Sequence, residues 1–269
     1  MPEGPEVKRA AEALAKVLSG RTIERVEIMS GRYAKKPFDG HSDLVAELPK
    51  RVVGAGCHGK FIYILLDGGD SSLWSTLGMT GHWSRSASNH ARVRLCLDDG
   101  SDVYYNDTRN FGTLKWSRGR RMLAQKLKSL GPDMLAEDVT HERFQAALLR
   151  KPKWTLAQAL MDQGIIAGVG NYVKADSLWV ARLSPHRKVD SLSSEEFEAL
   201  NDSIKRVLRD SYESQGATIK SYKGFNNESG GYGEMFLCYG RDKDDDGEEV
   251  VREETLDGRT TWWVPARQV

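Results

Sequence analysis

Residues 1–10 of the chain read MPEGPEVKRA, and this stretch predicts a chain end held directly against the start of a helix. Proline suits the first helical position, as at Pro5, and an acidic residue in the first turn, as at Glu6, favours the helix dipole. Apolar residues then recur at helical spacing, at Val7, Ala11, Leu14 and Leu18. Because Gly20 is a typical helix stop, we predict a helix over residues 5–19.

Outward from this helix, the pattern of the chain changes twice. Over residues 21–116, short runs rich in β-branched and aromatic residues alternate with turns, which is typical of an antiparallel sandwich or barrel. Residues 120–214 follow a helical pattern, and residues 193–196 form a capping box at the start of a long helix. Near the C-terminus, Asp257-Gly258 separates two strand-like runs and predicts a tight hairpin. This order of elements predicts an α+β fold.

Composition argues against several classes of protein. Hydrophobic residues make up 39% of the 269 residues and charged residues 29%, as in soluble globular proteins, and no apolar run is long enough to cross a membrane. The N-terminus lacks the basic and apolar regions of a signal peptide, so we expect the protein to stay in a reducing compartment. The three cysteines, Cys57, Cys96 and Cys238, form no Cys-x-x-Cys pair, which argues against a disulfide framework and against a zinc ribbon.

The net charge of +1 conceals an uneven distribution of charge. Residues 242–254 carry eight acidic and two basic side chains, a local charge of −6, so the rest of the chain carries +7. A basic excess of this size can serve a phosphate backbone if it gathers on one face, and it can equally be scattered and solvated.

Pro2, Glu3 and Glu6 place an amine and two carboxylates at the chain end. Removal of Met1 would expose the secondary amine of Pro2, and an N-terminal amine titrates near about 8, so part of it is neutral at cellular pH. Such an amine can attack carbonyl-like carbon, including C1′ of a deoxyribose that bears a damaged base, to give an iminium (Schiff base). The carboxylates can supply general acid–base catalysis. In the alternative interpretation, Pro2 merely begins the chain and the two glutamates cap a helix.

Seven motifs in one order resemble those of the formamidopyrimidine-DNA glycosylase and endonuclease VIII family. They are MPEGPEV (1–7), HGKF (58–61), LGMTG (77–81), DTRNFG (107–112), LGPD (130–133), the segment 162–172 ending in GVGNY, and YGR (239–241) together with GRT (258–260). The resemblance covers most of the chain. It implies an N-terminal helix with a catalytic antiparallel β-sandwich over 1–120, a DNA-binding domain with a helix–two-turns–helix over 121–225, and a finger hairpin over 226–269. DNA would run across the cleft between the domains.

The resemblance also implies the chemistry of the chain end. Pro2 would attack C1′ and release the base, Glu3 would be the acid that assists opening of the sugar ring, and Glu6 would assist as well. Elimination on both sides of the sugar would then cut the strand, because the iminium acidifies the proton at C2′. Lys60 would contact the phosphates beside the damaged site as a point charge. Without the resemblance, Lys60 reads as an exposed lysine at the end of a strand.

The resemblance implies five further DNA contacts. Met79, Arg109 and Phe111 correspond to the trio that fills the space left by a flipped-out nucleotide. Their turn-rich surroundings predict exposed loop tips, although Met and Phe can equally lie in a core. Asn171 follows a Gly-x-Gly turn at a predicted helix start, where backbone N–H groups bind phosphate well. Arg259 matches the finger arginine that reaches phosphate.

The C-terminal part departs from the family pattern. Many members end in a zinc finger with four thiolate ligands, but Cys238 is the only cysteine in this region, so the segment resembles the metal-free "zincless finger" of some relatives. The EF-hand calcium pattern is formally met by Asp242, Asp244, Asp246 and Glu253. Residues 235–239, however, read as a strand and not as the helix that precedes such a loop, so a solvated acidic loop is favoured.

Two further departures concern substrate contacts. Thr76 stands where the family often has a histidine before its LGM motif, which leaves one phosphate contact in doubt. Residues 221–237 resemble a flexible loop that closes over the damaged base in some members. The opening motif and the missing zinc ligands favour the endonuclease VIII side of the family, which implies oxidised pyrimidines and hydantoins.

We therefore expect a bifunctional DNA glycosylase/AP lyase that removes oxidised bases from damaged double-stranded DNA through a Schiff base at Pro2. It should act as a monomer, without a cofactor or metal, inside the cell, in the cytoplasm (nucleoid) or the nucleus according to the host. The alternative is a non-catalytic DNA-binding protein that kept the fold and lost the chemistry.

Overall fold

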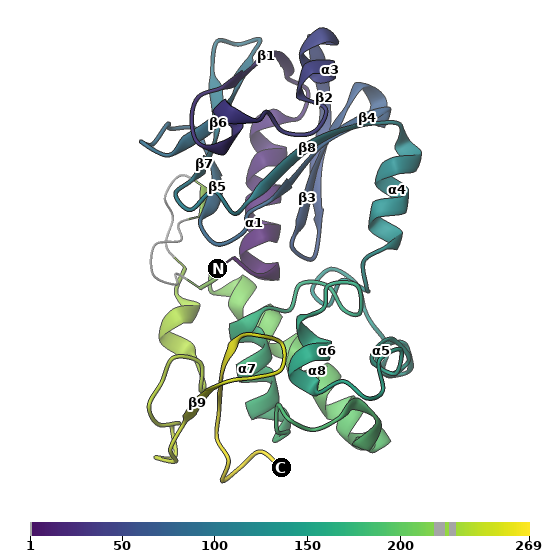
Figure 1. Cartoon of the computed structure of the whole chain (residues 1–269), viewed down its shortest axis with the longest axis vertical. Coiled ribbons are helices and arrows are strands. Elements are labelled where there is room, and N and C mark those ends of the chain that lie inside the picture. The colour runs from purple at the N-terminus through teal and green to yellow at the C-terminus, as the bar shows by residue number, and fades with distance from the viewer. Residues whose placement is uncertain (1, 218–223, 226–229) are drawn as a thin grey trace. The chain divides into compact units, whose positions relative to one another are not determined.

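The computed structural model describes residues 2–217, 224–225 and 230–269 (Figure 1). These residues fall into two compact units. The first contains Pro2, Glu6–Lys128 and the described residues of Ala217–Gly230, and the second contains Glu3–Pro5, Ser129–Gly216 and Gly231–Val269. None of the helices among them is long and apolar enough to cross a membrane.

Helix α1 (Gly4–Leu18) confirms the helix predicted over residues 5–19. Its apolar stripe is buried in the core of the first unit, where Leu14 and Leu18 are fully covered. Burial of one leucine side chain contributes roughly 1.5–3 kcal/mol, so the stripe holds the helix firmly on the sheet.

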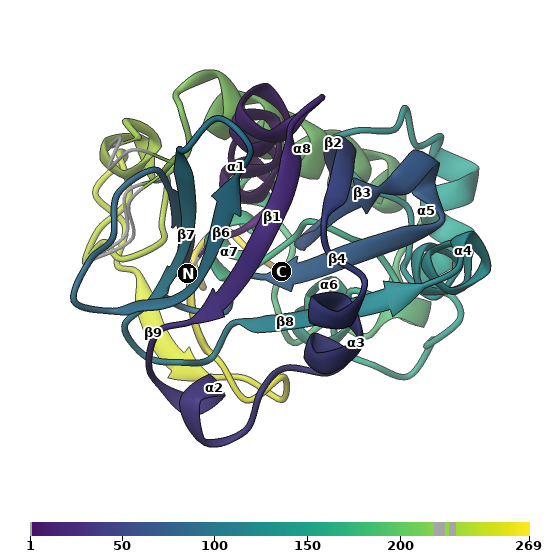
Figure 2. The same ribbon diagram turned by 90° about the horizontal axis from the view of Figure 1, so that it is seen from above.

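Eight strands among the described residues form one antiparallel sheet in the first unit. They are β1 (Thr22–Ile28), β2 (Lys50–His58), β3 (Phe61–Leu66), β4 (Ser71–Thr76), β5 (Gly81–Ser84), β6 (Ala91–Leu97), β7 (Asp102–Asp107) and β8 (Thr113–Arg118). Their order is β5-β7-β6-β1-β2-β3-β4-β8. At the centre, β1 and β2 pair at two positions, Thr22 with Arg51 and Ile23 with Lys50. The sheet divides there into two halves, with β5, β7, β6 and β1 in one and β2, β3, β4 and β8 in the other. Figure 2 shows the two groups of strands on either side of the junction between β1 and β2.

One apolar core joins the two halves of the sheet. It takes Trp83 and Val93 from one half and Ile62 and Leu73 from the other, and all four are fully buried. The indole N–H of Trp83 also donates to the hydroxyl of Ser75 in the other half, at 3.1 Å. Packing of both halves around one core confirms the predicted sandwich.

Short helical segments lie between the strands or directly after the last one. They are α2 (Arg32–Lys35), α3 (His41–Ala46), the 3-10 turn η1 (Asp67–Gly69) and α4 (Arg120–Lys128). The segment from α2 to α3 lies along β8, because the N–H of Leu114 donates to the hydroxyl of Tyr33 at 2.7 Å. The N–H of Trp116 likewise donates to the carbonyl of Asp39 at 2.9 Å. A side chain at Gly40 would lie 2.6 Å from the Trp116 carbonyl, so glycine permits this close approach.

The second unit is helical. Its elements are α5 (His141–Leu148), α6 (Leu156–Met161), α7 (Asn171–Ala181), α8 (Ser194–Glu213) and the 3-10 turns η2 (Val189–Ser191) and η4 (Tyr232–Met235). The predicted capping box begins α8: the Ser193 hydroxyl accepts the N–H of Glu196, and the Glu196 carboxylate accepts the N–H of Ser193. Thr155 and Gln158 form the same arrangement at the start of α6.

Helix α7 lies at the centre of the second unit. Residues 172–178 are all buried, so the helix is covered by the rest of the unit on every side. It packs on α8, where the hydroxyl oxygens of Tyr172 and Ser211 are 2.9 Å apart. Ala175 packs with Cys238 and Val264 in a small apolar cluster beside the C-terminal hairpin.

The C-terminal hairpin consists of β9 (Val251–Glu254) and β10 (Thr260–Trp263). Glu254 pairs with Thr260, and Gly258 lies between the strands at φ +69°, which confirms the predicted turn at Asp257-Gly258. The left-handed conformation is one that glycine adopts without strain.

The strand predicted over residues 235–239 is wrong. Residues 232–235 form η4, and the following backbone turns toward Asp176 on α7. The carboxylate of Asp176 accepts the N–H groups of Leu237, Cys238 and Tyr239 at 3.0–3.2 Å. A buried carboxylate therefore satisfies the backbone donors that a partner strand would otherwise take.

Candidate functional site

Glu3 lies at the N-terminus of α7, within the second unit. Its carboxylate accepts the N–H of Tyr172 at 3.0 Å and that of Val173 at 3.2 Å, and the residue is 1% exposed. The unpaired N–H groups and the dipole at a helix start favour a negative charge there. Glu3 is therefore fixed in place as a carboxylate by the first turn of α7.

Two glycines of the predicted Gly-x-Gly turn make this arrangement possible. The N–H of Gly4 donates to the carbonyl of Gly168 at 2.8 Å, so the chain end runs directly against the turn. A Cβ at Gly170 would lie 2.2 Å from the carboxyl carbon of Glu3, closer than any real contact. The Gly-x-Gly turn thus packs directly against the segment that carries Glu3 and holds it in place.

Pro2 and Glu6 belong to the first unit. Pro2 is buried and directly precedes Glu3. Glu6 is 4% exposed in the first turn of α1, and its carboxylate accepts the N–H of Ala217 at 2.6 Å. Of the loop predicted over residues 221–237, residues 221–223 and 226–229 lie outside the described residues. Glu6 therefore anchors the chain shortly before that loop begins.

Lys60 occupies the turn between β2 and β3. Gly59, at φ +55°, lets the chain reverse within two residues, and His58 pairs with Phe61 across the strands. Lys60 is half-buried in this turn. The position at a strand end agrees with the sequence, and the contact with phosphate stays a prediction.

Asp107 joins the two loops that carry Met79 and Arg109. Its buried carboxylate accepts the hydroxyl of Thr80 at 2.6 Å through one oxygen and the N–H of Gly112 at 2.8 Å through the other. The Thr80 hydroxyl in turn accepts the N–H of Arg109 at 2.9 Å. One carboxylate therefore holds together two loops that are separate in the sequence.

The tips of these loops are close together and accessible. A Cβ at Gly78 would lie 2.6 Å from the backbone nitrogen of Gly112, so the two backbones are almost in contact. Phe111 is 56% exposed, and the guanidinium of Arg109 lies 4.8 Å from the centre of its ring. Met79 is half-buried and follows Gly78. The structure thus places the predicted trio in one pair of packed loops, outside the core.

Asn171 begins α7, as predicted, but the N–H groups of the next two residues are occupied by Glu3. Its amide donates to the carbonyl of Thr260 in the hairpin at 2.7 Å. Arg259 directly precedes Thr260 and is exposed. The two residues predicted to contact phosphate therefore lie near each other within the second unit.

A buried ion pair holds the hairpin turn on α7. Nζ of Lys174 lies 2.7 Å from Oδ2 of Asp257, and the two side chains are 0% and 3% exposed. The same ammonium donates to the Thr261 hydroxyl at 2.7 Å, and the Thr255 hydroxyl donates to the other oxygen of Asp257. Burial lowers the pKa of Lys174, and its hydrogen bond to Asp257 opposes this effect. The turn that precedes Arg259 is therefore fixed from inside the protein.

Asp176 holds the other side of the finger. Burial raises the pKa of this carboxyl to about 6, and the N–H groups of Cys238, Tyr239 and Leu237 oppose the rise. Burial also raises the pKa of the Cys238 thiol, so that residue stays a neutral thiol packed in the apolar cluster.

The acidic run contains a structural carboxylate. Asp244 is 4% exposed, and it accepts the N–H groups of Asp246 and Glu248 together with the indole N–H of Trp179. The Arg267 guanidinium lies 2.7 Å from it. The interpretation of a solvated loop is therefore wrong for Asp244. In the part of the chain that the structure describes, no group of three His, Cys, Asp or Glu residues is placed to hold a metal, so the calcium pattern has no site.

Sequence reasoning missed the residues that hold these contacts in place. Thr80 and Asp107 lie in the LGMTG and DTRNFG motifs, next to the residues predicted to contact DNA. This proximity in the sequence was the available signal. Lys174 is a lysine within an apolar helical stretch, which could have marked it as a buried partner. Its counterion, Asp257, is far away in the sequence, and nothing in the pattern pairs the two.

Comparison with known proteins relates the whole chain to one family. Residues 1–114 match the formamidopyrimidine-DNA glycosylase N-terminal domain and residues 130–223 its H2TH domain. The chain is 34% identical to the formamidopyrimidine-DNA glycosylase of Heliobacterium modesticaldum, with 100% of both chains covered, and 32% identical to that of Mycobacterium avium, with 100% and 98% covered.

Solved structures agree. The MutM (Fpg) protein of Thermus thermophilus matches with a TM-score of 0.87 and 30% identity, over 99% of this chain and 98% of that one. A Lactococcus lactis FPG mutant in complex with Fapy-dG containing DNA matches with a TM-score of 0.87 and 26% identity, over 99% of each chain. Because these likenesses extend over both units, the fold is that of a DNA repair glycosylase. The chain belongs to the formamidopyrimidine-DNA glycosylase family, as its seven motifs predicted.

Proposed function

We propose that this protein is a bifunctional DNA glycosylase/AP lyase that removes oxidised bases through a Schiff base at Pro2. The observation that carries the proposal is the fixing of Glu3 by the first turn of α7, directly after Pro2 in the chain. A nucleophilic amine needs a positioned acid–base group within reach, and proximity of this kind is a large part of catalysis.

The chemistry begins once Met1 has been removed, because only then is the Pro2 nitrogen an amine. Its lone pair attacks C1′ as the bond to the base breaks, and the base leaves as an anion that takes a proton from water. The Glu3 carboxylate then accepts the proton of the Pro2 nitrogen and passes it to the ring oxygen O4′ as the C1′–O4′ bond breaks, which gives an iminium between Pro2 and C1′. Loss of the acidified C2′ proton expels the 3′ phosphate, and a second elimination expels the 5′ phosphate. Glu6, whose carboxylate accepts a hydrogen bond from the N–H of Ala217, would assist this chemistry from the first turn of α1.

DNA contacts follow from the accessible residues of each unit. In the first, Phe111, Arg109 and Met79 form a wedge held by Asp107, suited to the space left by a flipped nucleotide. Lys60 would contact phosphate from its turn. In the second unit, Arg259 and Asn171 would do the same. Damaged double-stranded DNA is the proposed partner, and a monomer acting inside the cell is sufficient for this function.

The substrate range is proposed from the relatives. A mutant of Lactococcus lactis FPG has been solved with Fapy-dG containing DNA, and the wild-type protein with an oxidized pyrimidine containing DNA. We propose that this chain accepts both classes, which retains the oxidised pyrimidines favoured by its sequence. A panel of duplexes with one lesion each will rank them.

Borohydride trapping tests the mechanism. The mature protein and a damaged duplex should give a covalent adduct after reduction, and Pro2→Gly should lose it. A form with one extra residue before Pro2, whose nitrogen is then an amide, should give no adduct, whereas the same residue added at the C-terminus should have no effect. Mass spectrometry of the intact chain establishes whether Met1 is absent.

The second candidate is a non-catalytic DNA-binding protein with the same fold. Its prediction is a shift of the duplex in a gel without any adduct. Binding weakens with salt in both cases, so salt dependence does not separate them. An adduct that persists when the Pro2 nitrogen is an amide would overturn the proposed nucleophile.

A further inference from the structure

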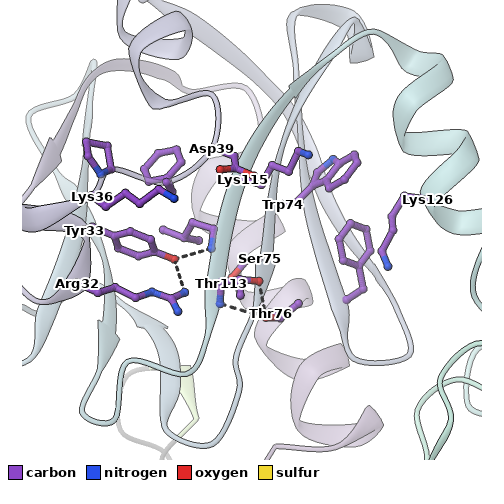
Figure 3. A pocket seen from close by; sticks show the side chains of 14 residues that line it. Arg32, Tyr33, Lys36, Asp39, Trp74, Ser75, Thr76, Thr113, Lys115 and Lys126 are labelled. Atoms are coloured by element: carbon purple, nitrogen blue, oxygen red, sulfur yellow. Dashed lines mark hydrogen bonds between the residues drawn. The ribbon is translucent and has the colours of Figure 1, made fainter.

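A basic and aromatic pocket lies in the first unit, and none of the residues proposed above for catalysis or DNA contact lines it (Figure 3). It has a volume of about 560 Å³, which is within the range of ligand sites. Four cationic side chains line it, against the one carboxylate of Asp39: they are Arg32, Lys36, Lys115 and Lys126. A net charge of +3 here contrasts with +1 for the whole chain.

Aromatic rings form one wall of this pocket. The rings of Phe61 and Trp74 meet edge to face, with centroids 5.5 Å apart. Nζ of Lys126 lies 5.5 Å from the centre of the Phe61 ring, and Nζ of Lys115 lies 5.6 Å from the centre of the Trp74 ring. Trp74 is half-buried, so part of its ring is accessible. Because a lysine side chain is flexible, its ammonium can leave the ring for a phosphate while the ring accepts a base.

The rim of the pocket continues into the two loops that carry Met79, Arg109 and Phe111, residues 77–81 and 107–112, which are called the wedge loops below. Thr76 and Thr113 face each other there, with their hydroxyl oxygens 2.7 Å apart. Thr76 begins the chain segment that leads to Met79, and Thr113 follows Phe111 and Gly112. The Arg32 guanidinium also donates a hydrogen bond to the carbonyl of Gly112. Figure 3 shows the Arg32 side chain at the end of the pocket where Thr76 and Thr113 lie.

We propose that this pocket binds one or two nucleotides of an unpaired DNA strand, without regard to a lesion. A cationic groove with aromatic rings is the chemistry by which proteins bind single strands, since phosphates meet the cations and bases stack on the rings. Continuity with the wedge loops favours a strand over a free nucleotide, because a strand can extend along the rim. The proposal adds a site that removal of the damaged base does not require.

The test compares two pairs of lysines on, or directly next to, the same two helices. Lys36 and Lys126 line the pocket, whereas Lys35 on α2 and Lys128 on α4 are exposed and do not line it. Lys36→Ala/Lys126→Ala and Lys35→Ala/Lys128→Ala therefore remove the same charge from the same parts of the chain. The probe is a fluorescent, lesion-free single-stranded dT12, and its affinity for the full chain is measured by anisotropy over a range of salt concentrations.

The pocket pair should bind dT12 more weakly, and the slope of log affinity against log salt should fall by about 1.4, the value for two lost phosphate contacts. The control pair should keep the wild-type slope. Trp74→Ala should weaken binding at least about fivefold through lost stacking, and Trp74→Phe should retain it. Equal losses in both lysine pairs, or no loss in either, would overturn the proposal. Competition by free dTMP as strong as that by unlabelled dT12, and lost in the pocket pair, would overturn the choice of a strand, because the pocket would then bind a free nucleotide.

Borohydride trapping on a short lesion duplex separates this inference from the proposed function. The pocket pair should form the adduct at the wild-type rate. Failure of the wild-type protein to form any adduct would count against the glycosylase proposal, whereas unchanged dT12 binding by the pocket pair would count only against the pocket.

Discussion

Replacing Asp257 by asparagine should destabilise the second unit more than any surface change of the same size. The substitution keeps the volume and an oxygen for the Thr255 hydroxyl, but it leaves the ammonium of Lys174 without its counterion at a position that is 0% exposed. Loss of one partner from a buried pair costs about 3–5 kcal/mol. At roughly 2–4 °C per kcal/mol, this lowers the melting temperature by about 6–20 °C.

Thermal unfolding at pH 7, followed by circular dichroism, measures the effect. Lys174→Met/Asp257→Asn removes both charges, so it should recover more than half of the loss. The matched control is Asp190→Asn, which breaks the ion pair of Asp190 with Lys153, whose nitrogen lies 2.6 Å away. That lysine is 79% exposed and solvent screens the pair, so the melting temperature should change little. The reasoning is refuted if Asp257→Asn has the same melting temperature as the Asp190→Asn control, or if the double variant is no more stable than Asp257→Asn.

Four further outcomes are expected. Gly170→Ala should lower adduct formation about 100-fold by displacing Glu3, while Gly231→Ala, whose Cβ would meet nothing nearer than 3.6 Å, should leave the rate unchanged. Phe111→Ala should lower base excision at least about tenfold with an unchanged melting temperature, because the ring is 56% exposed; parallel losses of stability and activity would contradict a wedge. The pKa of Asp176 in the folded protein is about 6, above its ordinary value of 3.8. The protonated carboxyl therefore makes its full contribution to the free energy of unfolding below pH 3.8, and this contribution is lost as the pH rises through 6. Wild type should therefore lose stability relative to Asp176→Asn between pH 3.8 and about 6 in melting curves, and a constant difference across that range would exclude the shift. EDTA should leave strand cleavage intact, and inactivation by EDTA would disprove a metal-free finger.

Local patterns predicted much of the fold because local physics produces it. Helix α1, the capping box at Ser193 and the hairpin turn at Gly258 each depend on a few neighbouring residues. The sandwich followed from alternation within short strands, but the strand order depends on long-range pairing. The strand expected at residues 235–239 failed because Asp176, from a different element, supplies the hydrogen bonds.

The candidate site divides in the same way. Motif order predicted Glu3, Lys60 and the trio Met79, Arg109 and Phe111 as site residues, and the structure brings the trio into one pair of loops. The motifs did not predict that Glu3 would accept the N–H groups at the start of α7 that were expected to bind phosphate. That contact joins two segments that are far apart in the sequence. Nor did it predict the inward role of Asp244, which composition alone assigns to solvent.

The bonds around Glu3 and Gly4 bear on how the protein matures. They hold the polypeptide immediately after Pro2. An aminopeptidase that cuts before Pro2 would therefore change the chemistry of its nitrogen and leave the tether intact. Maturation would then be a purely chemical switch, from inert amide to reactive amine, with no refolding step, and the fraction of active enzyme in a preparation would equal the fraction that has been trimmed.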